Sequence, residues 1–123
     1  MSWQAYSDAL VADPNVSGAA ITGFPDGGLW CATDLALQGT EGAGLCARMS
    51  SPGSGASIVC GGISYMATNC TEDFLTGRKG SGGICVTKSG KALLVCVYGE
   101  GMNAGSALDA CTKMADDLTS KGF

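Results

Sequence analysis

Apolar and polar residues follow patterns along the chain that predict a helix near each end and short strands between them. Over residues 3–12 the larger apolar side chains lie at positions 3, 6 and 10, which places them on one side of a helix. Ser2 is a suitable N-cap for this helix, and Asp13-Pro14 is expected to end it. Over residues 103–120, apolar residues recur three and four positions apart, which predicts a second, longer helix.

Between the helices, short apolar segments separated by glycine and polar residues predict strands. The expected strands cover residues 18–24, 29–33, 58–60, 63–67, 74–77, 83–88 and 92–98. The last segment is continuously apolar, as a buried central strand would be. A short helix is also expected over residues 40–49. This order of elements predicts an α+β fold with a central antiparallel sheet, in a single domain over residues 1–123.

The composition is that of a folded domain rather than a disordered chain. Hydrophobic residues make up 46% of the 123 residues, enough to form one core. The N-terminal sequence lacks a basic segment followed by an apolar one, and the longest apolar run, residues 92–98, is too short to cross a membrane. We therefore expect a soluble, cytoplasmic protein.

The balance of charges argues against nucleic acid as a partner. Seven basic and eleven acidic residues give a net charge of −4 at pH 7, whereas nucleic-acid-binding domains carry an excess of cations. Four cations, Arg78, Lys79, Lys88 and Lys91, nevertheless fall in a stretch without acidic residues. They form either a basic binding face or a solvated surface without a specific role.

The absence of histidine narrows the possible chemistry. It excludes a Ser-His-Asp triad, a Cys-His pair and every histidine metal site. Carboxylate or lysine chemistry is still open in principle, but no pair of residues is marked for it, and we predict no catalytic residue and no metal. The seven cysteines are odd in number and include no C-x-x-C pair. We interpret them as reduced, small apolar side chains of the core; a disulfide framework or a zinc site is the alternative.

One glycine pattern requires a nucleotide site to be considered. Residues 99–104 fit a relaxed G-x-G-x-x-A motif, follow an apolar strand and open a helix. However, no strand follows to carry the acidic residue that binds the ribose, and Glu100 would face the phosphates. A plain strand-to-helix turn is the favoured interpretation, no cofactor is predicted, and a small nucleotide-binding enzyme is kept as an alternative.

Aromatic residues are few but include a group near the chain ends. Trp3 and Tyr6 lie one helical turn apart, Trp30 lies early in the second expected strand, and Phe123 is the last residue. They either pack in the core or form a shelf of rings that can receive a polyproline II helix.

Several segments in order along the whole chain resemble the profilin family, in particular its non-vertebrate members. They are MSWQAY at residues 1–6, GAAITG at 18–23, DGGLW at 26–30, GISYM at 62–66, GRKGSGG at 77–83 and the stretch 98–123, which ends in GF. The resemblance implies an antiparallel sheet with the N- and C-terminal helices packed together on one face. It also implies a protein that binds actin monomers and proline-rich segments and is not an enzyme.

The resemblance further implies two binding surfaces. Proline-rich ligands would bind between the terminal helices, on Trp3, Tyr6, Trp30 and Phe123. The family usually has Tyr or His where Asp117 stands, so affinity for polyproline is expected to be weaker or its sequence preference altered. Monomeric actin would bind on the opposite side, through Arg78, Lys79, Lys88, Asn103, Gly105 and Lys113, whose cations suit its acidic surface.

From this resemblance we expect a regulator of actin polymerisation and of nucleotide exchange on actin, which works at the cytoskeleton with proline-rich proteins such as formins. Phosphoinositide binding is expected to be weak because the net charge is −4. The alternative within the same fold is a polyproline-binding scaffold that has lost actin binding.

Overall fold

The computed structural model describes residues 3–24, 28–35, 44, 58–60, 63–70, 74–80, 82–99 and 101–122. Two helices and seven strands are formed by these residues. They are α1 (Trp3–Val11), β1 (Gly18–Gly23), β2 (Leu29–Thr33), β3 (Ile58–Cys60), β4 (Ile63–Cys70), β5 (Phe74–Lys79), β6 (Gly82–Lys88), β7 (Ala92–Tyr98) and α3 (Ala104–Ser120).

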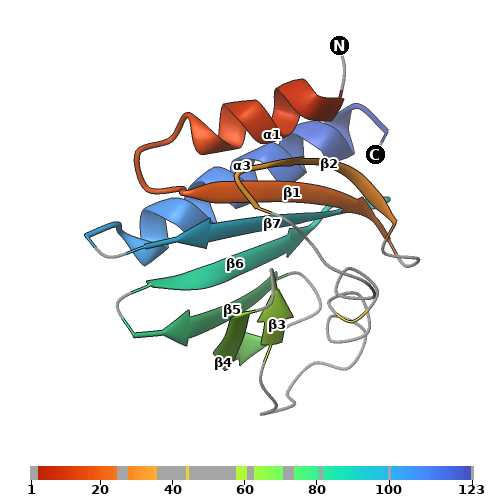
Figure 1. The fold of residues 1–123 in the computed structure, drawn as a ribbon. Coiled ribbons are helices and arrows are strands. Elements are labelled where there is room, and N and C mark those ends of the chain that lie inside the picture. The colour runs from red at the N-terminus through yellow and green to blue at the C-terminus, as the bar shows by residue number, and fades with distance from the viewer. Residues whose placement is uncertain are drawn as a thin grey trace.

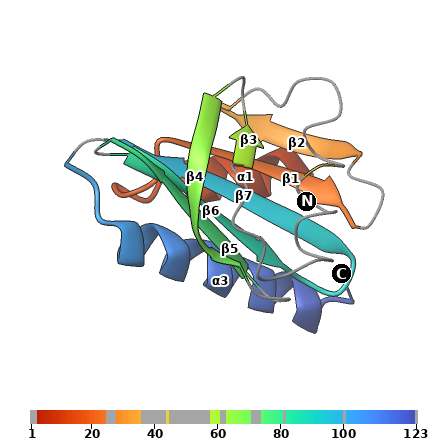
Figure 2. The same cartoon turned by 90° about the horizontal axis from the view of Figure 1, so that it is seen from below.

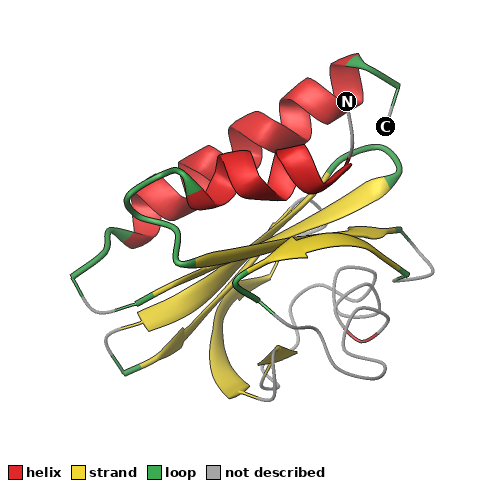
Figure 3. Ribbon diagram, turned by 45° about the horizontal axis from the view of Figure 1, so that its top comes forward, coloured by secondary structure: helices red, strands yellow, loops and turns green. Residues whose placement is uncertain are grey.

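The strands form one antiparallel sheet in the order β2-β1-β7-β6-β5-β4-β3. Both helices lie side by side on one face of this sheet, with α1 over β1 and β2 and α3 over β6 and β7 (Figures 1 and 3). In the view from below, β4 crosses in front of the other strands, α1 lies behind the sheet and α3 runs along its lower edge (Figure 2). The expected α+β fold is therefore confirmed.

The predicted elements are confirmed with small changes at their ends. The largest changes are in β4, which continues three residues beyond the expected end to Cys70, and in β5, which continues to Lys79. β5 is longer because Arg78 and Lys79 pair in register with Gly83 and Gly82, although their exposed side chains give no apolar signal. The helix expected over residues 40–49 lies outside the described residues, apart from Gly44.

Each face of the sheet has its own apolar cluster. The cluster beneath the helices contains the side chains of α3 that recur every three or four residues, Ala107, Cys111, Ala115 and Leu118, packed on strands β1, β6 and β7. The cluster on the opposite face contains Leu75, Ile84, Val86, Leu93 and Val95. Because neighbouring residues of a strand point to opposite faces, β6 and β7 contribute to both clusters, which explains why β7 is continuously apolar.

Asn103 fixes the start of α3. Its side-chain oxygen accepts a hydrogen bond from the backbone N–H of Ser106 at 2.9 Å, as an N-cap does. Its own backbone N–H donates to Asn15 Oδ1, also at 2.9 Å. The cap thereby ties α3 to the connection between α1 and β1. Neither described helix has the length and apolar character needed to span a membrane.

Candidate ligand groove and charged surfaces

An open groove of about 320 Å³ runs between α1 and α3. Its lining combines small and apolar side chains with three charged ones: Ala9, Leu10, Asp13, Ala110, Lys113, Met114 and Asp117. The helices are antiparallel, so the start of α1 lies beside the end of α3, where Tyr6 and Lys121 meet. The small alanines keep the helices from filling the space between them, which leaves an apolar floor with a charged rim.

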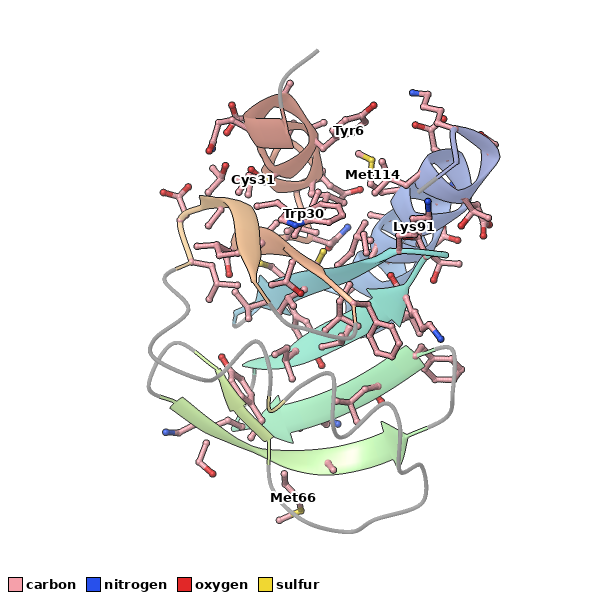
Figure 4. The ribbon with its side chains drawn as sticks, turned by 90° about the vertical axis from the view of Figure 1, so that its right-hand side faces the viewer. Tyr6, Trp30, Cys31, Met66, Lys91 and Met114 are labelled. Atoms are coloured by element: carbon pink, nitrogen blue, oxygen red, sulfur yellow. The ribbon has the colours of Figure 1, made fainter. Side chains whose placement is uncertain are left out.

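Two of the predicted aromatic residues are placed at one end of this groove. Tyr6 is half-buried against the core beneath the helices, and Trp30 is 36% exposed on β2. Figure 4 shows Tyr6, Trp30 and Met114 in the space between α1 and α3. Trp3 begins α1, but its side chain is outside the described part of the structure, as is Phe123. Two of the four residues predicted for the shelf of rings, Tyr6 and Trp30, therefore have described side chains, and the shelf itself stays a prediction.

Asp117, where the resemblance implies Tyr or His, forms part of a charged contact with Tyr6. Lys121 Nζ donates to Asp117 Oδ2 at 2.9 Å and to the Tyr6 hydroxyl at 3.4 Å. The same ammonium lies 5.4 Å from the centroid of the Tyr6 ring, within the range of a cation–π interaction. The hydrogen bonds with Asp117 and Tyr6 raise the pKa of Lys121. Asp117 therefore holds a cation over the aromatic end of the groove.

A hydrogen-bond network positions α1, and with it Tyr6, on β2. Gln4 Nε2 donates to the Ala32 carbonyl at 2.9 Å and to Thr33 Oγ1 at 2.8 Å. Thr33 Oγ1 also lies 2.8 Å from Ser7 Oγ and donates to Asp8 Oδ1. The pKa of Asp8 is lowered by the hydrogen bonds that its carboxylate accepts, mainly from Thr33 and to a lesser extent from Gln4. This network fixes α1 beside the strand that carries Trp30.

The four cations of residues 78–91 do not share one face, and the interpretation as a single basic face is wrong. Arg78 pairs with Gly83, on the side of the sheet that faces the helices. Lys79 follows Arg78 in the strand and so points to the opposite side. Lys88 is also on that opposite side, at the far end of β6, with its ammonium 4.3 Å from the centroid of Phe24. Strand alternation separates side chains that are close in sequence.

The remaining predicted actin-binding residues lie along α3. Asn103 and Gly105 are exposed at its start, at the same end of the sheet as Arg78. A Cβ on Gly105 would lie 3.3 Å from Asn103 Oδ1, so this glycine also leaves room for the helix cap. Lys113 instead lies on the rim of the groove between the helices, where it pairs with Asp109 at 3.0 Å. The structure therefore places Arg78, Asn103 and Gly105 at one end of the sheet, and Lys113 and Lys88 elsewhere.

Sequence reasoning missed two residues of these surfaces. Met66 is 72% exposed and pairs in register with Arg78, on β4, toward the edge of the sheet that lies farthest from the helices (Figure 4). The sequence did contain a signal for Met66: it is a large apolar residue between Tyr65 and Ala67, whose side chains pack on the opposite face of the sheet. Strand alternation therefore turns Met66 away from that cluster. Lys121 was also missed, because its partner Tyr6 lies 115 positions away in the sequence.

The described cysteine side chains behave as core residues. Cys31, Cys85, Cys96 and Cys111 are buried and unpaired by disulfides. Burial raises the pKa of Cys85 to about 12, so its thiol stays protonated. No cluster of potential metal ligands occurs among the residues that the structure describes. The burial of these four agrees with the interpretation of the cysteines as small apolar side chains of the core.

Comparison with known proteins identifies the family. The family model described as Profilin matches residues 1–123, the whole chain. The chain belongs to the profilin family. It is 36% identical to Profilin-A of Physarum polycephalum, with both chains covered completely. Among solved structures, Acanthamoeba castellanii profilin IB is 32% identical and superposes with a TM-score of 0.91 over 99% of this chain and 100% of the other. LokiProfilin1, in a complex with rabbit actin, shares the fold at 21% identity, with a TM-score of 0.78 over 94% of this chain and 93% of the other.

Profilins are non-enzymatic actin-binding proteins. In this profilin, the glycine-rich segment at residues 99–104 forms a turn that leads into α3. Gly101 has a φ of 82°, and the backbone N–H of Met102 donates to the Gly99 carbonyl at 3.2 Å. The Gly99 N–H is directed at the sulfur of Met102, 3.3 Å away. These groups are used to close a tight turn into α3, which is the structural interpretation of the motif at residues 99–104.

Proposed function

We propose that this profilin binds actin monomers on one surface and proline-rich segments on another, and that it can hold both at once. The observation that carries the proposal is the presence of two separate exposed surfaces on either side of α3. One is the groove with Tyr6 and Trp30, between α3 and α1. The other is formed by Met66 and Arg78, where the sheet extends beyond α3.

The Met66–Arg78 surface has the chemistry expected of a protein-binding site. A large exposed apolar side chain beside a cation offers both contact area and attraction to an acidic partner. Asn103 and Gly105 extend this surface to the start of α3. The related fold of LokiProfilin1 has been solved with actin. We assign the actin site to this surface. Lys79 and Lys88, on the opposite face of the sheet, and Lys113, on the rim of the groove, are left out of this assignment.

The groove suits proline-rich segments. A polyproline II helix is already extended before it binds, so it loses little conformational entropy on a rigid shelf. Tyr6 and Trp30 supply ring faces for prolines, and their hydroxyl and indole groups are hydrogen-bonding groups for the ligand backbone. Trp3 and Phe123 complete the proposed shelf. Proline-rich proteins such as formins are the proposed partners.

The cellular role follows from these two surfaces. By preferring one conformation of the actin monomer, the protein would promote nucleotide exchange on actin without any catalytic side chain. It would then deliver monomers to proline-rich proteins at the cytoskeleton, in the cytoplasm. Phosphoinositide binding would be weak, because the cations of residues 78–91 are divided between two faces.

A bridging experiment tests the proposal. Beads that carry polyproline should retain this profilin, and only in its presence should they retain monomeric actin. Retention of the protein without actin would favour the alternative of a scaffold that has lost actin binding. Failure to retain the protein itself would contradict the assignment of the groove.

A further inference from the structure

The groove between α1 and α3 extends beyond its aromatic end. Tyr6 lies toward one end, beside Lys121. Ala9 and Leu10 line the groove farther along α1, and Asp13 lines it in the turn that follows Val11, the last residue of that helix. On the other side of the groove, Ala110 lies about 10 Å from Asp117 at 1.5 Å per helical residue. A polyproline II ligand rises 3.1 Å per residue, so this extension accommodates roughly three further residues.

The extension is negatively charged after the ion pairs on its rim are taken into account. Lys113 pairs with Asp109, and Lys121 pairs with Asp117, so each cation is compensated by a carboxylate on its own helix. Asp13 is half-buried at the groove, and its Oδ1 accepts the backbone N–H of Asn15 at 2.9 Å. Among the described residues, no cation forms an ion pair with Asp13. The two helices and Asp13 together carry five aspartates and two lysines over residues 3–13 and 104–121.

We infer that the extension is a subsite for a basic residue of the proline-rich ligand, about three residues from the prolines that pack on Tyr6. Its apolar floor of Leu10, Ala110 and Met114 covers the methylene groups of an arginine or lysine, and Asp13 and Asp117 attract the charged end. This inference rests on the proposed binding of proline-rich segments in the same groove. It adds that the protein prefers proline-rich segments with an arginine or lysine about three residues from the prolines that pack on Tyr6.

The carboxylate of Asp117 fits this preference. It adds a negative charge at the junction of the aromatic end and the extension. An incoming guanidinium can share Asp117 with Lys121, because a carboxylate accepts several hydrogen bonds.

Titration of tryptophan fluorescence with a set of capped peptides tests the inference. The set contains decaproline and variants with arginine or glutamate at the third or the eighth residue, all acetylated and amidated so that they carry no terminal charge. At least one arginine peptide should bind about two- to fivefold more tightly than decaproline, as expected for exposed ion pairs, and the matching glutamate peptide more weakly. The arginine advantage should shrink as salt is raised.

Matched variants locate the effect. Asp13→Asn keeps the oxygen that accepts the Asn15 N–H, and it should remove most of the arginine advantage, measured as the ratio of arginine-peptide affinity to decaproline affinity for the same variant. Asp116→Asn makes the same charge change at an exposed position of α3 that does not line the groove, and it should keep the advantage. Equal affinity for arginine peptides and decaproline would overturn the inference and leave proline binding intact. Absence of binding by every peptide would overturn both.

Discussion

Lys121 holds its ammonium 5.4 Å from the centroid of the Tyr6 ring and 3.4 Å from the Tyr6 hydroxyl, across the groove between the first and last helices. The position of this cation depends on Asp117, one helical turn earlier. The aromatic end of the groove is therefore partly covered by the chain itself, and a proline that packs on Tyr6 has to displace the ammonium or share the ring with it.

Removal of this cation should expose the ring. For Lys121→Ala we expect decaproline to bind up to about fivefold more tightly, because an exposed cation–π contact is worth about 0.5–1 kcal/mol and no longer has to be displaced. Isothermal titration calorimetry with decaproline provides the measurement. Lys79→Ala removes the same charge at a strand end on the opposite side of the sheet, and its affinity should equal that of the wild type. Weaker binding by Lys121→Ala would show that the ammonium assists the ligand instead.

The network around Asp8 predicts a dependence of stability on acid. Hydrogen bonds from Thr33 and Gln4 lower the pKa of Asp8 in the folded state. A lowered folded-state pKa means that the stabilisation is fully present above the unfolded-state value, near pH 4, and is lost as the pH falls through the folded-state pKa. The melting temperature of the wild type should therefore fall more between pH 7 and pH 3 than that of Asp8→Asn.

Asp116→Asn is the control for this measurement. Asp116 is also an exposed aspartate on a helix, but none of the described hydrogen bonds joins its carboxylate to the sheet. Its melting temperature should show the same acid dependence as the wild type. If Asp8→Asn and the wild type lose equal stability on acidification, the carboxylate does not hold α1 on β2.

Gly83 is required by the position of Tyr98. A Cβ on Gly83 would lie 2.4 Å from the Tyr98 hydroxyl oxygen and 2.4 Å from the Gly77 carbonyl oxygen, far inside van der Waals contact. Gly83→Ala should lower the free energy of unfolding by about 1–3 kcal/mol, the usual cost of overpacking a core. Urea denaturation measures the change. Gly99→Ala, whose Cβ would meet nothing within 4 Å, should lose much less; equal losses would contradict the packing argument.

Most of the fold could be predicted from the sequence, because its signals are local. The spacing of Ala107, Cys111, Ala115 and Leu118 predicts the buried side of α3, and the continuous apolar run of β7 predicts a central strand. The helix predicted over residues 40–49 lies outside the described residues. The ends of β4 and β5 were missed because polar residues there pair through their backbones, which hydrophobic periodicity does not report.

The binding surfaces were less predictable because they depend on register and on contacts between distant residues. Arg78 and Lys79 are adjacent in sequence but point to opposite faces of the sheet, so a count of nearby cations could not reveal the surface. Met66 reaches that surface only because β4 pairs with β5 in a register that places it opposite Arg78. Lys121 and Tyr6 meet because the terminal helices pack in antiparallel directions, which the sequence of either helix does not specify.

The central claim is that the Met66–Arg78 surface binds monomeric actin, and a direct titration of labelled actin monomers with the wild type and two variants tests it. The wild type should bind saturably, and Arg78→Glu should bind about tenfold more weakly, because it reverses a charge within the contact. Lys91→Glu, the same reversal in the turn between β6 and β7 at the other end of the sheet, should bind almost as well as the wild type. Absence of saturable binding, or equal losses in both variants, would contradict the claim.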